Sequence, residues 1–567
     1  MNIKKFLAGI FTALLLTISC NEEKWLEEKP FDFYAPDNSY VTTAQFKQAV
    51  NLLYDNLRNM HFWSSGGGYN HTLQECSDLT FWPWLPFGVQ TDQNFSVMVI
   101  PTSSRVSTVW DICYIGIGNA NEILFRLQEP NQVGDADIQI FRGEALFFRA
   151  YFYRILAHLF AGVPLQLEPV TSPKRDFVRS SREEVYNRCR IDLEEASGLL
   201  PDIDKVKDGA LSKQAAQHLL SEIYISLKDY PKAISAASAV INFPGMGLMT
   251  ERFGSRRNEP GDVYWDLFRL NNQNRSNGNT ESILVLQYDF QNAGSRYGNH
   301  TIRHFLPQLR AVQCESNTGG LVLAFTDLTA EKGGRGNGYC QPTHFMSIGI
   351  WGDDFDNDIR NSQYNVVRDF RIDNPNAKGF GEWLVADGWL LGADTFVNWY
   401  PSFMKVARVG NFPEASYARN ADGSIRQTAL GEHIIVNSGE LAHCSFKDEY
   451  LFRLAETYLL RAEAYIGNNE KDKAAADINM VRNRANATPV NVSDVDIDFI
   501  LDERGRELYA EEYRNITLSR LGKFVERSWK YSPVGYHTGE HQNLWPIPYG
   551  EIEKNILTPL EQNPGYK

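Results

Sequence analysis

The same helical hairpin occurs twice in this chain, in two stretches that lie far apart. The first runs from Ser212 to Asn242 and the second from Asp448 to Ala487. In each, apolar residues recur every three to four positions, which is the spacing of one helix face, and a short break separates two such helices. In the second stretch the apolar face consists of Leu451, Leu454, Ala455, Tyr458, Leu459 and Ala462. Both stretches therefore predict a helix–turn–helix with a closely packed seam.

The two hairpins also match residue by residue in a single register. Leu219, Glu222, Tyr224, Ile225, Lys232, Ala233 and Val240 correspond to Leu460, Glu463, Tyr465, Ile466, Lys473, Ala474 and Val481. Self-similarity of this kind is typical of helical repeats such as the tetratricopeptide type, in which small alanines let neighbouring helices approach closely. Two unrelated helical hairpins are the alternative interpretation.

Further helical segments lie on both sides of a long stretch with a different texture. They run from Thr43 to Arg58, Ser104 to Leu127, Asp135 to Phe160, Glu183 to Leu200, Leu211 to Leu227 and Asp494 to Tyr513. The last carries alternating charges, which predicts a solvent-exposed face. From Phe243 onward Gly, Asn and Asp punctuate short apolar runs such as Ser282 to Tyr288, which predicts loops, short helices and a few strands. We therefore expect a mostly α-helical repeat scaffold, at 41–243 and 448–567, that carries a large irregular insert at 244–447.

The chain starts with a basic residue pair, an apolar run from Phe6 to Ile18 and then Ser19 and Cys20. This is the pattern of a secretory signal peptide, and the run is short for a membrane-spanning helix. A Cys at this place resembles the bacterial lipoprotein signal, in which the Cys is acylated and becomes the mature N-terminus. We therefore expect a signal peptide over 1–19, a lipid on Cys20 and a tether over 20–40. An ordinary cleaved signal with a chance Cys is the alternative.

Composition excludes some classes of function. The net charge of −14, with no basic run, argues against nucleic-acid binding because nothing would neutralise the phosphates. The 7 Cys residues show no CxxC spacing, so neither a zinc site nor a redox pair is predicted. The 12 Trp and 26 Tyr residues exceed what a core needs, so some can be exposed for binding flat or sugar-like faces.

A Gly- and Pro-rich loop over 61–88 concentrates large aromatic residues. Trp63, Trp82 and Trp84 can offer stacking faces to a sugar ring, and Asp78 is near enough in sequence to bind its hydroxyls. The alternative is a local aromatic cluster that belongs to the core. A second aromatic-rich region contains Trp383, Trp389, Trp399 and Tyr400.

One acidic run has a weak resemblance to a calcium-binding loop. In DDFDND, Asp354, Asp356 and Asp358 stand at alternate positions, but the Gly and the Glu that a calcium loop needs are missing. The alternative is a solvated acidic turn beside Arg360. No other cofactor is expected.

Several motifs, taken in order, resemble the SusD/RagB family. They are the lipoprotein start, RAYFYRILAHLFAGVPL, DIRNSQYNVVRDF, FRLAETYLLRAEAYIGN with INMVRNRA, LDERGRELYAEEYR and the closing LWPIPYGEIEKN with LEQNPGY. The resemblance implies four tetratricopeptide-like helix pairs with an irregular ligand-binding half. It implies a surface lipoprotein of the outer membrane that captures oligosaccharides, without catalysis. It also implies a partner, a SusC-like, TonB-dependent barrel on which the protein acts as a lid.

The family's ligand contacts do not form a fixed motif, so the resemblance implies only candidates. Glycan-binding members use aromatic residues from the loop after the first helix, here Trp63, Trp82 and Trp84. They also use the insert after the third repeat, here Tyr288, Arg296 and Tyr297.

Three other functions compete with glycan capture. Oligopeptide capture, as in RagB-like members, would use main-chain-binding edges and pockets for charged termini. A glycoside hydrolase would need two carboxylates across a cleft, which the abundant Asp and Glu could supply. A repeat scaffold for protein partners would leave the loop aromatics unexplained.

Overall fold

The computed structural model describes residues 39–61, 70–83, 95–290, 292, 298–392, 397–407, 410–534 and 538–567. Cys20, Trp63, Trp84, Arg296 and Tyr297 therefore lie outside the described residues. Within these ranges the fold is mostly helical, as predicted. No helix among them combines the length and the apolar character that crossing a membrane requires.

The helices fall into a group of scaffold helices and a group of short helices, most of which belong to the insert. The scaffold helices are α3 (Thr43–His61), α5 (Ser104–Arg126), α6 (Asp135–Phe160), α7 (Arg182–Leu199), α8 (Lys213–Ser226), α9 (Tyr230–Ile241), α14 (Leu454–Gly467), α15 (Lys471–Arg484), α16 (Ile497–Leu508), α17 (Arg514–Leu521) and α18 (Phe524–Tyr531). The short helices are α4 (Phe95–Met98), α10 (Val263–Leu267), α11 (Thr301–Phe305), α12 (His344–Ser347), α13 (Gly439–His443) and α19 (Tyr549–Lys554).

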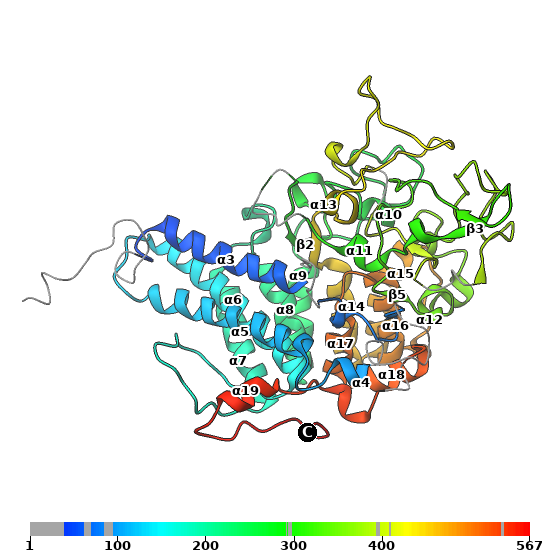
Figure 1. Cartoon of the computed structure of the whole chain (residues 1–567). Helices are drawn as coiled ribbons and strands as arrows, with labels where there is room; N and C mark the ends of the chain where they lie inside the picture. Colours follow the sequence, from blue (N-terminus) through cyan, green and yellow to red (C-terminus); the bar gives the residue numbers. More distant parts are fainter. Residues whose placement is uncertain are drawn as a thin grey trace, which may run out of the picture.

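The scaffold helices stack in sequence, and the stack continues across the insert. Each of α5 to α9 packs on the next, and α14 then packs on α9 (Figure 1). A Cβ atom at Gly467, at the end of α14, would lie 2.2 Å from the Tyr230 ring of α9, so only glycine permits this approach. The two hairpins are thus spatial neighbours, although the whole insert separates them in sequence.

The internal repeat extends to backbone and ion-pair detail. Lys228 and Asn469, at matching places in the two turns, both have a φ of 61°. Glu222 pairs with Arg154 and the matching Glu463 pairs with Arg520, each at 2.7 Å. The predicted relation between the two hairpins is therefore confirmed.

The strands form small two-stranded antiparallel sheets rather than one large sheet. The pairs are β1 (Thr80–Phe81) with β5 (Gln341–Pro342), β2 (Ser282–Leu286) with β8 (Glu449–Arg453), β3 (Gln313–Glu315) with β4 (Leu321–Leu323), and β6 (Val366–Val367) with β7 (Ser402–Phe403). The insert has hydrophobic clusters of its own beside the main core of the scaffold. Its end is tied to its early part by the β2–β8 pair.

Two sequence predictions need correction. The helical face predicted from Leu451 starts only at Leu454, because residues 449–453 pair with β2 as strand β8. The helix predicted to reach Tyr513 ends at Leu508. There the Lys405 amino group donates to the carbonyls of Glu507 and Tyr509, at 3.0 and 2.9 Å, and so satisfies the helix end.

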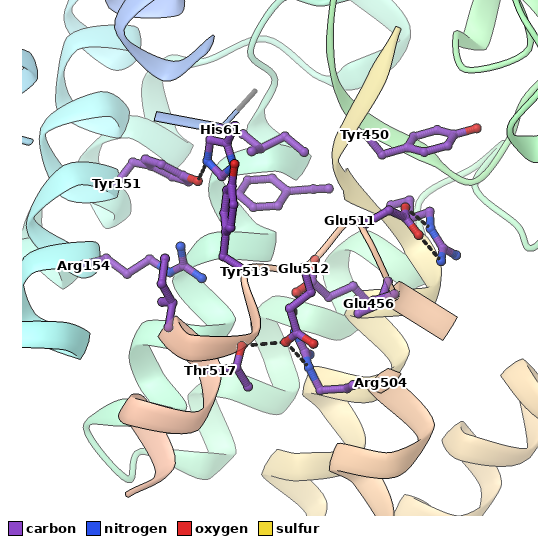
Figure 2. Close-up of a pocket in the computed structure, with 15 residues that line it drawn as sticks. His61, Tyr151, Arg154, Tyr450, Glu456, Arg504, Glu511, Glu512, Tyr513 and Thr517 are labelled. Carbon is purple, nitrogen blue, oxygen red and sulfur yellow. Dashed lines mark hydrogen bonds and ion pairs between the residues drawn. The ribbon is translucent and has the colours of Figure 1, made fainter. Parts of the chain in front are cut away.

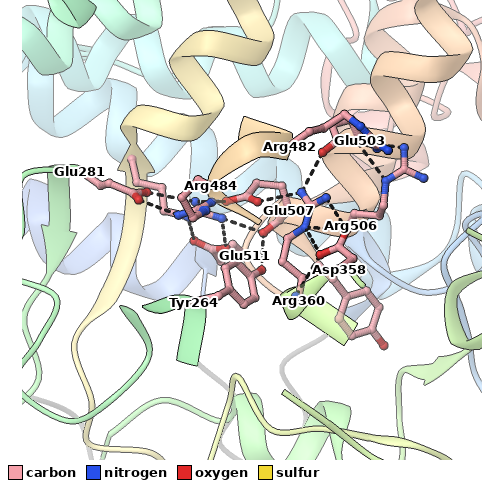
Figure 3. A network of polar contacts seen from close by, with 12 residues as sticks. Tyr264, Glu281, Asp358, Arg360, Arg482, Arg484, Glu503, Arg506, Glu507 and Glu511 are labelled. Atoms are coloured by element: carbon pink, nitrogen blue, oxygen red, sulfur yellow. Dashed lines mark hydrogen bonds and ion pairs between the residues drawn. The ribbon is translucent and has the colours of Figure 1, made fainter. Parts of the chain in front are cut away.

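The charged face of α16 is buried, where the sequence predicted a solvent-exposed one. Glu503 and Glu507 are fully buried at the junction between scaffold and insert (Figure 3). Arg360, from the insert, contacts Glu503 at 2.7 Å and Glu507 at 3.0 Å. The other buried arginines that pair with these two carboxylates are Arg453, Arg482, Arg484 and Arg506. The charged motifs of the C-terminal part therefore join the insert to the scaffold.

Candidate functional site

The loop after α3 is anchored by Asp78, which is fully buried. Its carboxylate accepts from Arg514 at 2.9 and 2.7 Å and from Arg527 at 2.6 Å. Burial alone would raise the pKa of Asp78, but the two guanidinium groups outweigh it and lower the pKa. Both oxygens are thus engaged inside the protein. The prediction that Asp78 contacts a ligand is wrong, because its role is to hold the loop.

The anchored loop delivers an aromatic side chain to the insert. Directly after Asp78, strand β1 pairs with β5 of the insert, and Phe81 stands opposite Gln341. Thr343 extends the link by donating its hydroxyl to the Asp78 carbonyl at 2.8 Å. The loop and the insert therefore form one continuous surface at this sheet.

At this sheet the surface contains a hollow of about 660 Å³, which we call the aromatic hollow. It is lined by Phe81, Gln341, Pro342, His344, Ser347, Ile348, Trp399, Tyr400, Pro401, Lys530, Tyr531, Ser532 and Pro533. These residues come from the loop, the insert and the end of α18. Volumes of about 300–1,000 Å³ with mainly apolar walls are typical of sites for small ligands.

Two features give the aromatic hollow its chemistry. The Tyr531 ring, half-buried, stacks on Phe345 with ring centroids 3.7 Å apart. The lining also carries polar side chains, among them Gln341, His344 and Lys530, which can form hydrogen bonds with the hydroxyls of a ligand. The hollow thus offers aromatic walls together with polar side chains.

Two other predicted site residues lie outside the hollow lining. Trp82 packs against the scaffold core, with the Arg105 guanidinium 4.8 Å from its ring and Tyr339 edge-on at 6.3 Å. Tyr288 also packs partly buried against that core, and its backbone N–H donates to Asp448 at 2.7 Å. Of the described aromatic residues of the 61–88 loop, only Phe81, the neighbour of Trp82, lines the hollow.

A second cavity lies between α6 and the C-terminal helices α16 and α17 but is too small for a sugar (Figure 2). Its volume is about 40 Å³, and its walls include His61, Tyr151, Arg154 and Tyr513. A water molecule needs about 10–15 Å³ of such space, so the cavity has room for a few waters.

The aspartates of the acidic run in the insert form ion pairs and hydrogen bonds rather than a calcium site. Asp354 accepts from Arg482 and Thr488, each at 2.6 Å, and Asp358 pairs with Arg360 at 2.6 Å. Asp356 is exposed. These contacts engage the two buried carboxylates, and among the described residues the three aspartates do not form a group whose ligand atoms all lie within 4.8 Å of one another. The alternative, a solvated acidic turn, holds for Asp353 and Asp356, which are exposed, but not for Asp354 and Asp358, which are buried.

Sequence reasoning found part of this surface. It identified the aromatic loop and the second aromatic-rich region, and the structure brings Phe81 of the first to Trp399 and Tyr400 of the second. It missed Gln341 and Tyr531, which carry no sequence signal of their own. Only the β1–β5 pairing and the packing of α18 reveal them.

Two family models match the sequence. One, described as the SusD family, matches residues 437–566, and the other, described as "Starch-binding associating with outer membrane", matches residues 15–225. SusD-like protein P2 of Formosa agariphila is 27% identical over 299 residues, which span 52% of this chain and 55% of that relative. The starch-binding protein SusD of Bacteroides thetaiotaomicron is 24% identical over 523 residues, 88% of this chain and 86% of the relative.

Solved structures share the fold along nearly the whole chain. A laminarin binding SusD-like protein has a TM-score of 0.65 at 22% identity, over 93% of this chain and 100% of that one. Surface glycan-binding protein A from Bacteroides thetaiotaomicron, in complex with laminarihexaose, has a TM-score of 0.64 at 19% identity, over 92% and 99%. These structures show the shared fold, and the two family models together with the SusD relatives show that the chain belongs to the SusD/RagB family.

Proposed function

We propose that this protein captures oligosaccharides at the cell surface and binds them in the aromatic hollow. The observation that carries the proposal is the combination of aromatic and polar side chains in the lining of one hollow. A sugar presents an apolar C–H face and a rim of hydroxyls, which match these two features. Support also comes from relatives whose names or structures record starch, laminarin and laminarihexaose as ligands.

The lining favours binding over hydrolysis. A glycosidase needs two carboxylates that flank the scissile bond. The residues that line the aromatic hollow in the described part of the chain include Lys530 and His344 but neither Asp nor Glu. Capture without turnover requires only moderate affinity, which stacking and a few hydrogen bonds provide.

The first test is the Tyr531→Ala variant, measured against laminarin and starch as probes and then a wider glycan panel. We expect it to weaken binding of the recognised glycan by 10- to 100-fold, about 1–3 kcal/mol, because one wall of the hollow is removed. Tyr549→Ala is the matched control, since Tyr549 is an exposed tyrosine on α19 outside the lining. Affinity gel electrophoresis or calorimetry gives the readout.

Two results would count against the proposal. Binding of oligopeptides with silence across all glycans would assign the protein to peptide capture. Glycan binding that Tyr531→Ala and Gln341→Ala leave unchanged would place the site outside the aromatic hollow.

Delivery to a SusC-like barrel requires an anchor and a docking face. The lipid on Cys20 would provide the anchor. The scaffold has exposed apolar side chains on three neighbouring segments, which we call the scaffold patch: Ile115, Val170, Val178, Ile556 and Leu557. Ile115 and Val170 line one common hollow, and the Leu557 N–H donates to the Arg175 carbonyl at 2.9 Å, so the three segments lie close together. Exposed apolar patches of this kind mark surfaces for protein partners.

Two variants separate anchor from docking. Leu557 is 72% exposed, so Leu557→Asp should leave the fold intact while it reduces co-purification with the barrel, because a charge would be buried on docking. This variant should still sediment with membranes. Cys20→Ala should instead release the protein from the membrane fraction. Unchanged barrel recovery for Leu557→Asp would move docking away from the scaffold patch, and membrane retention of Cys20→Ala would argue against the lipid.

A further inference from the structure

A cluster of nitrogen and sulphur ligands lies where two segments of the insert meet. His300 directly precedes α11, and His443 ends α13 with Cys444 next in the chain. The two segments are fixed to each other by a pair of backbone hydrogen bonds between Asn299 and Ser445, both 2.8 Å long. The backbone at the cluster is therefore held from both sides.

The geometry of this cluster suits a metal ion. One ligand atom from each of His300, His443 and Cys444 lies within 4.8 Å of the other two. Among the described residues, this is the one group of three or more His, Cys, Asp or Glu side chains that meets that distance. With metal–ligand bonds of about 2.0–2.3 Å, ligand atoms around one zinc ion lie roughly 3.5–4 Å apart, so side-chain adjustments of about 1 Å would close the site.

A second observation points to a missing ligand. His300 is only 6% exposed, and its Nδ1 atom has no hydrogen-bond partner among the described residues. Buried polar atoms in proteins almost always have a partner, and an unpaired one of this kind can serve as a ligand for a bound ion. Cys444 is fully buried, whereas His443 is half-buried and gives the cluster access to solvent.

We propose that His300, His443 and Cys444 form a binding site for a transition-metal ion of the zinc class. Two imidazoles and one thiolate are ligands that Zn²⁺ binds well, whereas Ca²⁺ and Mg²⁺ prefer oxygen ligands. Three protein ligands leave a fourth position open for water. The ion would clamp the α11 segment to the α13 segment.

The test is a zinc titration of the purified full-length protein after removal of metals by a chelator. Competition with a chromophoric zinc indicator should give one site per chain, and Zn²⁺ should raise the thermal unfolding midpoint because it binds the folded state. Co²⁺ in place of Zn²⁺ should show a thiolate-to-metal charge-transfer band. Cys444→Ser should abolish that band and weaken zinc binding at least about tenfold.

Two control variants change a cysteine and a histidine that lie outside the cluster. Cys314→Ser changes another fully buried cysteine of the insert, and His433→Gln changes a histidine that pairs with Glu331. Both should bind zinc like the wild type. If Cys444→Ser proves unstable, His443→Ala, at the half-buried position, provides the second variant. The proposal is overturned by absence of zinc binding, by binding that survives both Cys444→Ser and His443→Ala, or by loss of binding in the controls alone.

Discussion

Glu507→Gln is expected to destabilise the protein by about 3–5 kcal/mol, because removing one partner from a buried ion network leaves charges uncompensated. Glu507 is fully buried and contacts Arg360, Arg453 and Arg484. Because the site is buried, water does not solvate the arginine charges that Glu507 leaves unpaired. Chemical denaturation of wild type and variant measures the change in the free energy of unfolding.

The same network predicts a specific acid sensitivity. Burial alone would raise the pKa of Glu503, but Arg360, Arg506 and Arg482 outweigh it and lower the pKa from 4.5 to about 2. The pKa of Glu507 also lies well below 4.5, since its arginines again outweigh burial. A lowered folded-state pKa adds stability that is complete above the unfolded value and is lost as the pH falls toward the folded value. The wild type should therefore lose stability between about pH 4.5 and 2, and Glu507→Gln should flatten this dependence.

An exposed ion pair of the insert serves as the control. Glu315 and Lys378 are 3.1 Å apart, and both are more than half exposed. Glu315→Gln should change the free energy of unfolding by less than about 1 kcal/mol, because solvent screens such pairs. An equally small effect for Glu507→Gln would show that the buried network does not stabilise the junction between scaffold and insert.

Asp78→Asn is expected to cost about 2–4 kcal/mol and also to weaken glycan binding. The cost stays below the full penalty for a broken buried pair, about 3–5 kcal/mol, because Arg527 and Arg514 keep other carboxylate partners. These partners are Asp498, Asp502 and Glu512. Binding should suffer because Asp78 holds the loop whose Phe81 lines the aromatic hollow. Denaturation gives the stability, and glycan affinity is measured where the variant is still folded.

Asp356→Asn, at an exposed position of the insert, should leave both quantities unchanged. A drop in stability with wild-type glycan affinity would separate the loop anchor from the hollow. The Asp78 prediction would then hold for the fold and fail for the site.

Local patterns predict the scaffold because the periodicity of a helix depends only on residues within one segment. The hairpin of α14 and α15 could be identified from spacing alone, and its relation to α8 and α9 from register. Strand β8 was missed because its residues are strand only through pairing with β2, which is remote in sequence. Its Leu451 fits helical spacing by coincidence.

The candidate site depended still more on remote contacts. Asp78 was interpreted as a ligand-binding residue because the partners that bury it, Arg514 and Arg527, lie at the other end of the chain. The glutamates of α16 were interpreted as solvent-exposed for the same reason. The sequence alone does not reveal whether a charged side chain is solvated by water or paired with an opposite charge from a distant segment. The aromatic regions were visible, whereas the hollow that some of them line exists only after folding.

The β2–β8 ladder has a consequence for how this architecture can vary. It brings the chain back to the scaffold directly before α14, and so closes the loop over residues 287–448 at its base, beside the buried ion network. The free energy of loop closure grows only with the logarithm of length, about 0.6 kcal/mol per doubling. Residues can therefore be added to or removed from the ligand-binding half with little penalty to the stacked helices. The ladder therefore allows the ligand-binding half to change in size and shape, and with it the binding specificity, while the superhelix keeps its register.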